Sequence, residues 1–137
     1  MKTIILAAVL VAAQTKTTAD SVYTAAQAKR GETVYGASCS SCHAPDLSGS
    51  GQASSLIGKD FNDAWDGQTL ADLFDRIQTT MPADAPGTLK PADSADVVAF
   101  ILSKGNFPAG EVELPADAAA LKAITFVRRA ALQGRHQ

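Results

Sequence analysis

The chain has 137 residues, a length typical of one domain, and its formal net charge at pH 7 is −2. The charge is uneven, because residues 20–121 carry 14 acids against 6 bases, a net charge of −8, whereas residues 122–137 carry four bases and no acid. An acidic body argues against a role in nucleic-acid binding and favours a protein partner attracted by charge.

The first 19 residues have the pattern of a secretory signal peptide. Lys2 precedes an apolar run over residues 4–13, which suits the apolar region of a leader and is too short to span a bilayer. Small residues at 11–13 and at 17–19 each form a possible cleavage site. We therefore expect an exported protein whose mature chain begins at Gln14 or at Asp20, with an uncleaved membrane anchor as the alternative.

The next stretch predicts a helix from Val22 to Tyr35, with Ser21 as its N-cap. Gly31 and Tyr35 are four residues apart, so they share a face on which the glycine leaves a notch beside an aromatic ring. The apolar run at residues 96–102, closed by Gly105 at a C-cap position, predicts a second helix that packs into this notch. Without that partner, Gly31 is an ordinary helix-weakening glycine.

Residues 39–43 read Cys-Ser-Ser-Cys-His, the attachment pattern of a c-type haem. In this interpretation Cys39 and Cys42 form thioether bonds to the porphyrin, and His43 is the proximal ligand of the iron. A haem would also supply apolar surface to the core of a chain in which only 6% of the residues are aromatic.

Three other chemistries use closely spaced cysteines. A thioredoxin-like CxxC lies between a strand and a helix of a βαβ unit, and the flanking sequence has no such alternation. A structural zinc site needs four ligands, and beyond Cys39, Cys42 and His43 the chain offers only His136. A disulfide between the two cysteines stays possible in an oxidising compartment, but it leaves the adjacent histidine unexplained.

Residues 70–77 predict a helix with one apolar face. Thr69 is a plausible N-cap, and Asp72 lies in the first turn, where the helix dipole favours an acid. The apolar positions have the spacing i, i+3, i+4, i+7 and are Leu70, Leu73, Phe74 and Ile77.

An extension over residues 111–137 follows the domain that we place at residues 20–110. Pro115 and Asp117 can begin a helix, whose short apolar stripe would consist of Leu121, Ile124 and Val127. We expect the extension to pack on the domain, and its basic end at Arg128-Arg129 is a candidate surface for docking a partner.

Taken together, the leader, the CxxCH, the Gly31–Tyr35 face and the helix around Phe100 resemble a class I cytochrome c over residues 23–110. The resemblance implies an all-α cytochrome c fold, with three to five helices around one covalently bound haem c and a short C-terminal extension. It also implies a periplasmic location, because bacteria attach haem c outside the cytoplasm.

In this family a methionine on a later loop is the sixth ligand of the iron. The chain has two methionines, and Met1 would leave with the leader, so Met81 is the candidate. Pro82 disfavours helical geometry at Met81, so the preceding helix must end there. We expect His43 and Met81 to bind the iron, with His136 as the alternative to Met81.

The resemblance also implies residues that line the haem. The family usually has Pro-x-Leu-x-Gly at this point, and its proline carbonyl accepts a hydrogen bond from the proximal histidine. Here Ser54 replaces the proline, and Leu56 is retained. The carbonyl of Ser54 can still accept the bond and orient the imidazole.

We expect the remaining haem contacts on the methionine side. Phe61 and Trp65 should line the haem edge together with the apolar face that includes Phe74 and Ile77. Trp65 and Arg76 are candidates for hydrogen bonds to the haem propionates. The alternative is that Trp65 belongs to the core and Arg76 to the solvent.

A closer similarity links residues 61–89 and 106–110 to the cytochrome c subunits and domains that serve PQQ-dependent alcohol dehydrogenases. It implies an electron carrier, not an enzyme, which accepts electrons from a separate quinoprotein and passes them to a terminal oxidase or another cytochrome. We expect a monomer or a transient complex, without membrane binding once the leader is removed. The alternatives are a haem subunit of a larger oxidoreductase, and a haem sensor or enzyme that binds a small ligand when Met81 dissociates.

Overall fold

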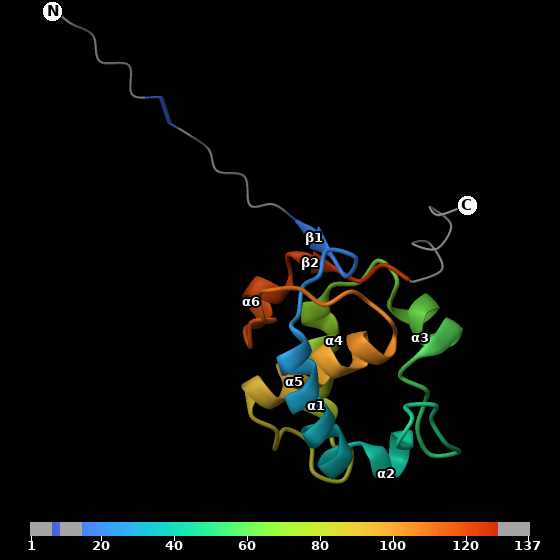
Figure 1. Cartoon of the computed structure of the whole chain (residues 1–137). Coiled ribbons are helices and arrows are strands. Elements are labelled where there is room, and N and C mark those ends of the chain that lie inside the picture. Colours follow the sequence, from blue (N-terminus) through green and yellow to red (C-terminus); the bar gives the residue numbers. More distant parts are fainter. Residues whose placement is uncertain (1–6, 9–14, 129–137) are drawn as a thin grey trace, which may run out of the picture.

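A computed structural model describes residues 7–8 and 15–128. This part of the chain is mostly helical, as Figure 1 shows, which confirms the predicted all-α fold. Its helices are α1 (Ala25–Ser38), α2 (Ser40–His43), α3 (Gly58–Trp65), α4 (Leu70–Thr80), α5 (Pro91–Lys104) and α6 (Ala118–Leu121). Two short strands, β1 (Lys16–Thr17) and β2 (Ile124–Thr125), pair in parallel. Within the described residues no helix is long and apolar enough to cross a membrane.

The crossing of α1 and α5 is the centre of the fold, and it forms at the predicted notch. A Cβ atom added to Gly31 would lie 1.8 Å from the carbonyl oxygen of Asp96 and 2.9 Å from Cβ of Phe100. One turn later, the rings of Tyr35 and Phe100 pack with their centroids 5.2 Å apart. The absent side chain therefore lets the two helix backbones touch, and the adjacent aromatic pair fills the space beside them.

The predicted start of α1 was wrong by three residues. Thr24 is the N-cap, and its side chain accepts a hydrogen bond from the Gln27 amide at 3.1 Å. The residues before it are extended, since the Tyr23 carbonyl accepts a hydrogen bond from Gly110 N at 2.7 Å and the Tyr23 hydroxyl donates to Phe107 O at 2.6 Å. These bonds to the segment after α5 hold the chain out of the helix until Thr24.

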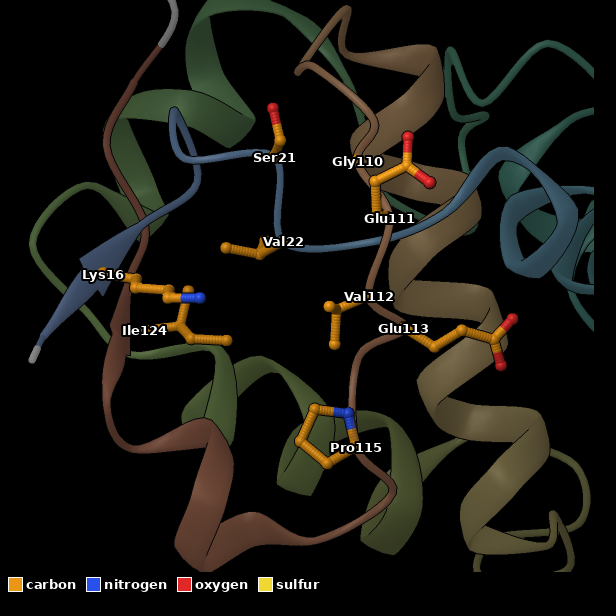
Figure 2. A pocket seen from close by; sticks show the side chains of 9 residues that line it. All are labelled: Lys16, Ser21, Val22, Gly110, Glu111, Val112, Glu113, Pro115 and Ile124. Atoms are coloured by element: carbon orange, nitrogen blue, oxygen red, sulfur yellow. The ribbon is translucent and has the colours of Figure 1, made fainter. Parts of the chain in front are cut away.

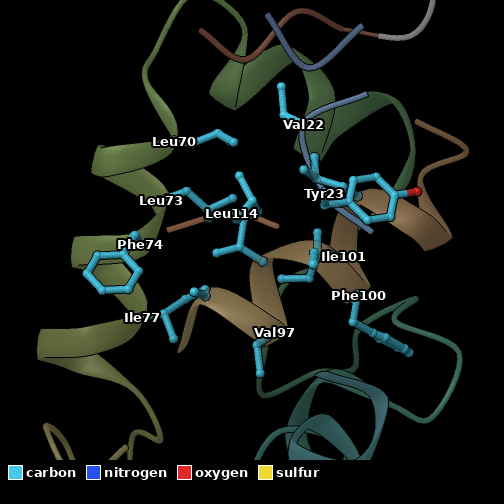
Figure 3. Packing of buried hydrophobic residues seen from close by; sticks show 14 of the residues in the cluster. Val22, Tyr23, Leu70, Leu73, Phe74, Ile77, Val97, Phe100, Ile101 and Leu114 are labelled. Carbon is cyan, nitrogen blue, oxygen red and sulfur yellow. The ribbon is translucent and has the colours of Figure 1, made fainter. Parts of the chain in front are cut away.

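Helix α4 follows its predicted pattern. Thr69 and Asp72 form a capping box, in which each side chain accepts a hydrogen bond from the backbone of the other residue. Figure 3 shows the face of α4 turned toward the side chains of α5 and of Leu114. All four predicted apolar positions are buried, namely Leu70, Leu73, Phe74 and Ile77.

Helix α5 ends at the predicted glycine. The amide of Gly105 donates to Ile101 O at 2.9 Å, as expected of a C-cap, and the left-handed residue that follows is Asn106, with φ of 63°. Asparagine tolerates this conformation better than most residues. The turn then directs Phe107 back into the core.

The extension packs on the helices, as expected, but not as the predicted helical stripe. Helix α6 ends at Leu121, Ile124 lies in β2, and Phe126 is 1% exposed. The ring of Phe126 packs edge-on against Phe61 at 5.9 Å and Phe107 at 5.2 Å between centroids. Pairing with β1 extends this segment, which explains why the helical spacing did not predict it.

Two polar clamps hold the extension to α1. The buried side-chain amide of Gln27 donates to Leu114 O at 3.0 Å and accepts from Leu114 N at 2.8 Å. Arg30 contacts Glu113 at 2.6 Å and Asp96 at 3.3 Å. The carboxylates raise the pKa of Arg30, and Arg30 lowers the pKa of Glu113.

The basic end of the extension also has partners within the fold. Arg128 donates to Asp63 at 3.2 Å through its guanidinium and to Asp66 at 3.0 Å through its backbone amide. Lys59 and then Arg128 lower the pKa of Asp63 through their hydrogen bonds. Arg129 and His136, which the sequence singled out, lie outside the described residues.

Candidate haem-binding site

The CxxCH motif lies on a single turn of helix directly after α1. Cys39 ends α1 by donating its amide to Tyr35 O at 2.9 Å, and it begins α2 by accepting from His43 N at 3.0 Å. Cys39 is half-buried and Cys42 is exposed, and neither is bonded to the other. One helical turn thus presents two unpaired thiols, which suits thioether attachment better than a disulfide.

Burial raises the pKa of the Cys39 thiol. Reactive redox cysteines have the opposite property, because a lowered pKa supplies the nucleophilic thiolate. The alternative of a thioredoxin-like dithiol is therefore not supported by the surroundings of Cys39.

The predicted hydrogen bond between His43 and the carbonyl of Ser54 is present. Nδ1 of His43 lies 2.7 Å from the carbonyl oxygen of Ser54. A carbonyl oxygen only accepts, so Nδ1 carries the proton and Nε2 keeps its lone pair for a metal. Serine thus replaces the usual proline without loss of the bond that orients the imidazole.

The loop between His43 and Ser54 is held by three hydrogen bonds, two of which reach carbonyl groups of the motif. The Tyr35 hydroxyl donates to Ala44 O at 2.5 Å, Gly49 N donates to His43 O at 2.9 Å, and Ser50 Oγ donates to Cys42 O at 2.7 Å. Sequence reasoning assigned no role to Ser50, because a hydroxyl–carbonyl contact within a loop leaves no periodic pattern. The backbone of the loop is thus anchored to the CxxCH.

Met81 ends α4 in the predicted way. Its amide still donates to Ile77 O at 3.1 Å, but its backbone is extended, with φ of −117° and ψ of 151°. The side chain is half-buried and packs against the core. The loop that follows is closed by Gln78, whose side chain donates to Leu89 O at 2.8 Å. The chain thus presents the thioether from a loop pinned at both of its ends.

The structure brings together the two candidates for the haem propionates. The guanidinium carbon of Arg76, on α4, lies 6.0 Å from the centroid of the Trp65 ring at the end of α3. Trp65 is half-buried and Arg76 is exposed. The other residues expected at the haem edge are buried in the core, namely Phe61, Phe74 and Ile77.

The residues present fit a haem. Several large apolar side chains pack against the core but are only half covered, and they include four that the sequence predicted to touch the haem: Cys39, Leu56, Trp65 and Met81. A porphyrin is a flat apolar group of the kind that such a half-covered set would bury. The described ranges contain no group of three or more His, Cys, Asp or Glu that could hold a metal ion.

A separate hollow of about 320 Å³ lies away from these residues. Figure 2 shows it between the start of the described chain and the extension, with Lys16 and Ile124 on one side and Val112 and Pro115 on the other. None of the residues predicted to bind haem lines it. The hollow therefore belongs to the packing of the extension and not to the candidate site.

Comparison with known proteins identifies the family of the chain. A family model described as cytochrome c oxidase, cbb3-type, subunit III matches residues 26–101, which is more than half of the chain. No curated protein and no solved structure matches the chain. The matched residues contain the CxxCH, Met81 and most of α1 and α5. The chain therefore belongs to the family of c-type cytochrome domains described as cytochrome c oxidase, cbb3-type, subunit III.

Proposed function

We propose that the chain is a periplasmic electron-transfer protein whose haem c is attached through Cys39 and Cys42 and ligated by His43 and Met81. Family membership makes it a haem-based electron carrier. The observation that carries the residue assignment is the 2.7 Å contact between His43 Nδ1 and Ser54 O. It fixes the imidazole in the tautomer that leaves Nε2 free for a metal.

The contribution of the chain would be to supply two ligands to the iron and to exclude other molecules from it. When bound, haem supplies an iron that changes between the ferric and ferrous states. His43 is oriented by Ser54, and Met81 is presented from the closed loop between Gln78 and Leu89. An iron held by both His43 and Met81 would have no position left for oxygen or an organic substrate, which favours outer-sphere electron transfer over catalysis.

The electron partner would approach near the attachment motif. Cys42 is exposed, and the motif lies at the end of the molecule away from β1 and β2 (Figure 1). The net charge of −8 over residues 20–121 would attract a partner with a basic surface. Electron-transfer partners form small, transient contacts, so their association rate should fall as added salt screens the charge.

A quinoprotein alcohol dehydrogenase is the proposed electron donor, and a terminal oxidase or another cytochrome is the acceptor. This part of the proposal is supported by the similarity of residues 61–89 and 106–110 to the cytochromes that serve PQQ-dependent enzymes. A second candidate is a haem subunit that stays bound in a larger oxidoreductase. The family description, which names a subunit of an oxidase, favours it.

Haem attachment is tested by a pyridine haemochrome spectrum and an intact mass on protein exported from a host that assembles c-type cytochromes. We expect one haem per chain that survives denaturation and acid extraction. The Cys39→Ser, Cys42→Ser double variant, exported in the same host, is the control and should carry no covalent porphyrin. A wild-type mass without porphyrin would refute the proposal.

The two candidate functions differ in their assembly. A carrier should sediment as a monomer and be reduced by catalytic amounts of a PQQ-dependent alcohol dehydrogenase, at a rate that falls with ionic strength. A permanent subunit should co-purify with its complex from native membranes and exchange electrons only within it. A reduction rate that does not change with ionic strength would show that electrostatic attraction does not drive the association of the two proteins.

A further inference from the structure

The start of the described chain is joined to the extension by a small sheet. Lys16 N donates to Ala123 O at 2.9 Å, and Thr18 N donates to Thr125 O at 3.0 Å. We call residues 16–18 together with residues 123–127 the terminal clasp. Residues 16–18 lie within the segment that the sequence assigned to the leader, yet they are hydrogen-bonded to a part of the folded domain.

Thr18 is the most firmly held residue of the clasp. It is 0% exposed. Its hydroxyl donates to Val127 O at 3.2 Å and accepts from Val127 N at 3.0 Å, so one side chain satisfies both backbone groups of Val127. Removing Thr18 would leave these groups without their partner, which is costly for buried polar atoms.

The other half of the clasp is part of the core of the domain. On the side away from β1, Phe126 N donates to Gln68 O at 2.7 Å, and Gly67 N donates to Phe126 O at 2.9 Å. The segment around β2 is therefore bonded on one edge to residues 16–18 and on the other to the turn that leads into α4. Loss of the first edge would loosen a segment that carries the buried Phe126.

Lys16 also forms one wall of the hollow shown in Figure 2. Val22 and Ile124, at 7% and 8% exposure, lie against the same hollow. A chain that began at Asp20 would lack this wall and would expose more of both apolar side chains. Exposure of these apolar side chains would thus lower the stability of the shorter chain further, beyond the loss of the hydrogen bonds.

We infer that the terminal clasp belongs to the mature protein, so that the leader is cleaved before Lys16, at the Ala13–Gln14 bond, and not after Ala19. The inference rests on export of the chain, which is part of the proposed function. A leader that is removed on export makes no native contacts, whereas residues 16–18 supply a buried side chain and several backbone hydrogen bonds. Of the two cleavage sites in the sequence, only the one after Ala13 leaves the clasp intact.

The first test is the intact mass of wild-type protein exported with its own leader, supported by N-terminal sequencing. We expect a mature start at Gln14. A start at Asp20, or an unprocessed leader, would overturn the inference. The same spectrum reports the porphyrin separately, because added haem mass does not depend on where the chain begins. Failure of the haem proposal and failure of the cleavage proposal therefore give different results.

The second test compares two haem-loaded chains that begin at Gln14 and at Asp20, each behind the same foreign leader. The shorter chain loses about four hydrogen bonds, so its thermal midpoint should fall by about 10 °C or more. Equal midpoints would overturn the inference.

Single substitutions in the full chain give the matched comparison if the shorter chain does not fold. Thr18→Val should lower the midpoint, because it keeps the shape of the side chain and removes both bonds to Val127. Thr17→Val is the control, since the Thr17 hydroxyl contacts only its local turn, at Ala19 and Asp20. An effect of Thr18→Val no larger than that of Thr17→Val would contradict a native role for the clasp.

Discussion

Replacement of Gly31 by alanine is the sharpest test of the helix crossing. The added Cβ atom would lie 1.8 Å from Asp96 O, which belongs to the backbone of α5 and cannot rotate away. Overpacking a well-filled contact costs about 1–3 kcal/mol, and a clash with backbone belongs at the top of that range. Alanine recovers about 1 kcal/mol through its higher helix propensity. The net loss for Gly31→Ala should be about 2 kcal/mol.

Gly36→Ala is the matched control, because Gly36 lies in the same helix and a Cβ added there meets nothing within 4 Å. That variant should gain about 1 kcal/mol from helix propensity alone. The two single-methyl variants should therefore differ by about 3 kcal/mol, or roughly 12 °C in thermal midpoint for a chain of this size. Denaturant and thermal unfolding of the haem-loaded proteins measure the difference. If Gly31→Ala proves as stable as Gly36→Ala, the close backbone contact between α1 and α5 at Gly31 is refuted.

Three further results follow from the caps and the titrating groups. Thr69→Ala should cost about 1 kcal/mol of unfolding free energy, because it removes the α4 cap. Burial raises the pKa of Tyr35 from 10.0 to about 12. The stabilising contribution of the neutral phenol is therefore complete below pH 10 and is lost as the pH rises toward 12. Unfolding measurements on Tyr35→Phe should show a smaller loss of stability over this alkaline range. Arg30 lowers the pKa of Glu113, so Glu113→Gln should flatten the loss of stability on acidification below about pH 5.

The parts of the fold that rest on local patterns could be predicted from the sequence. Gly31 and Tyr35 share a helix face through a fixed spacing, and the apolar run of α5 supplied the partner. Thr69 and Asp72 form their capping box within one turn, and Pro82 ends α4 at Met81. In each of these cases, residues a few positions apart determine the geometry.

The contacts between distant segments could not be predicted in this way. The strands of the terminal clasp are two residues long and have no alternation to recognise. The clamp between Gln27 and Leu114 joins a side chain to a backbone 87 residues away. Ser21 has the right chemistry for a cap, but the bonds of Tyr23 to the segment after α5 override it.

In the candidate site, too, the residues of a local motif could be predicted and the contacts formed by loop folding could not. The cysteines and His43 are contiguous, so their motif identified them, and the bond from His43 to Ser54 followed from a family pattern despite the missing proline. The bond from Tyr35 to Ala44, directly after the motif, and the bond from Ser50 to Cys42 depend on how the loop folds back. No spacing in the sequence indicates them.

The central claim is that His43 and Met81 would be the two protein ligands of one haem iron. The most direct measurement is the near-infrared spectrum of the ferric protein, in which a sulfur-to-iron charge-transfer band marks methionine ligation. Wild-type protein should show this band, Met81→Ala should lack it, and Leu89→Ala, which changes another half-buried residue of the same loop, should keep it. A wild-type spectrum without the band, or a band that persists in Met81→Ala, would contradict the account.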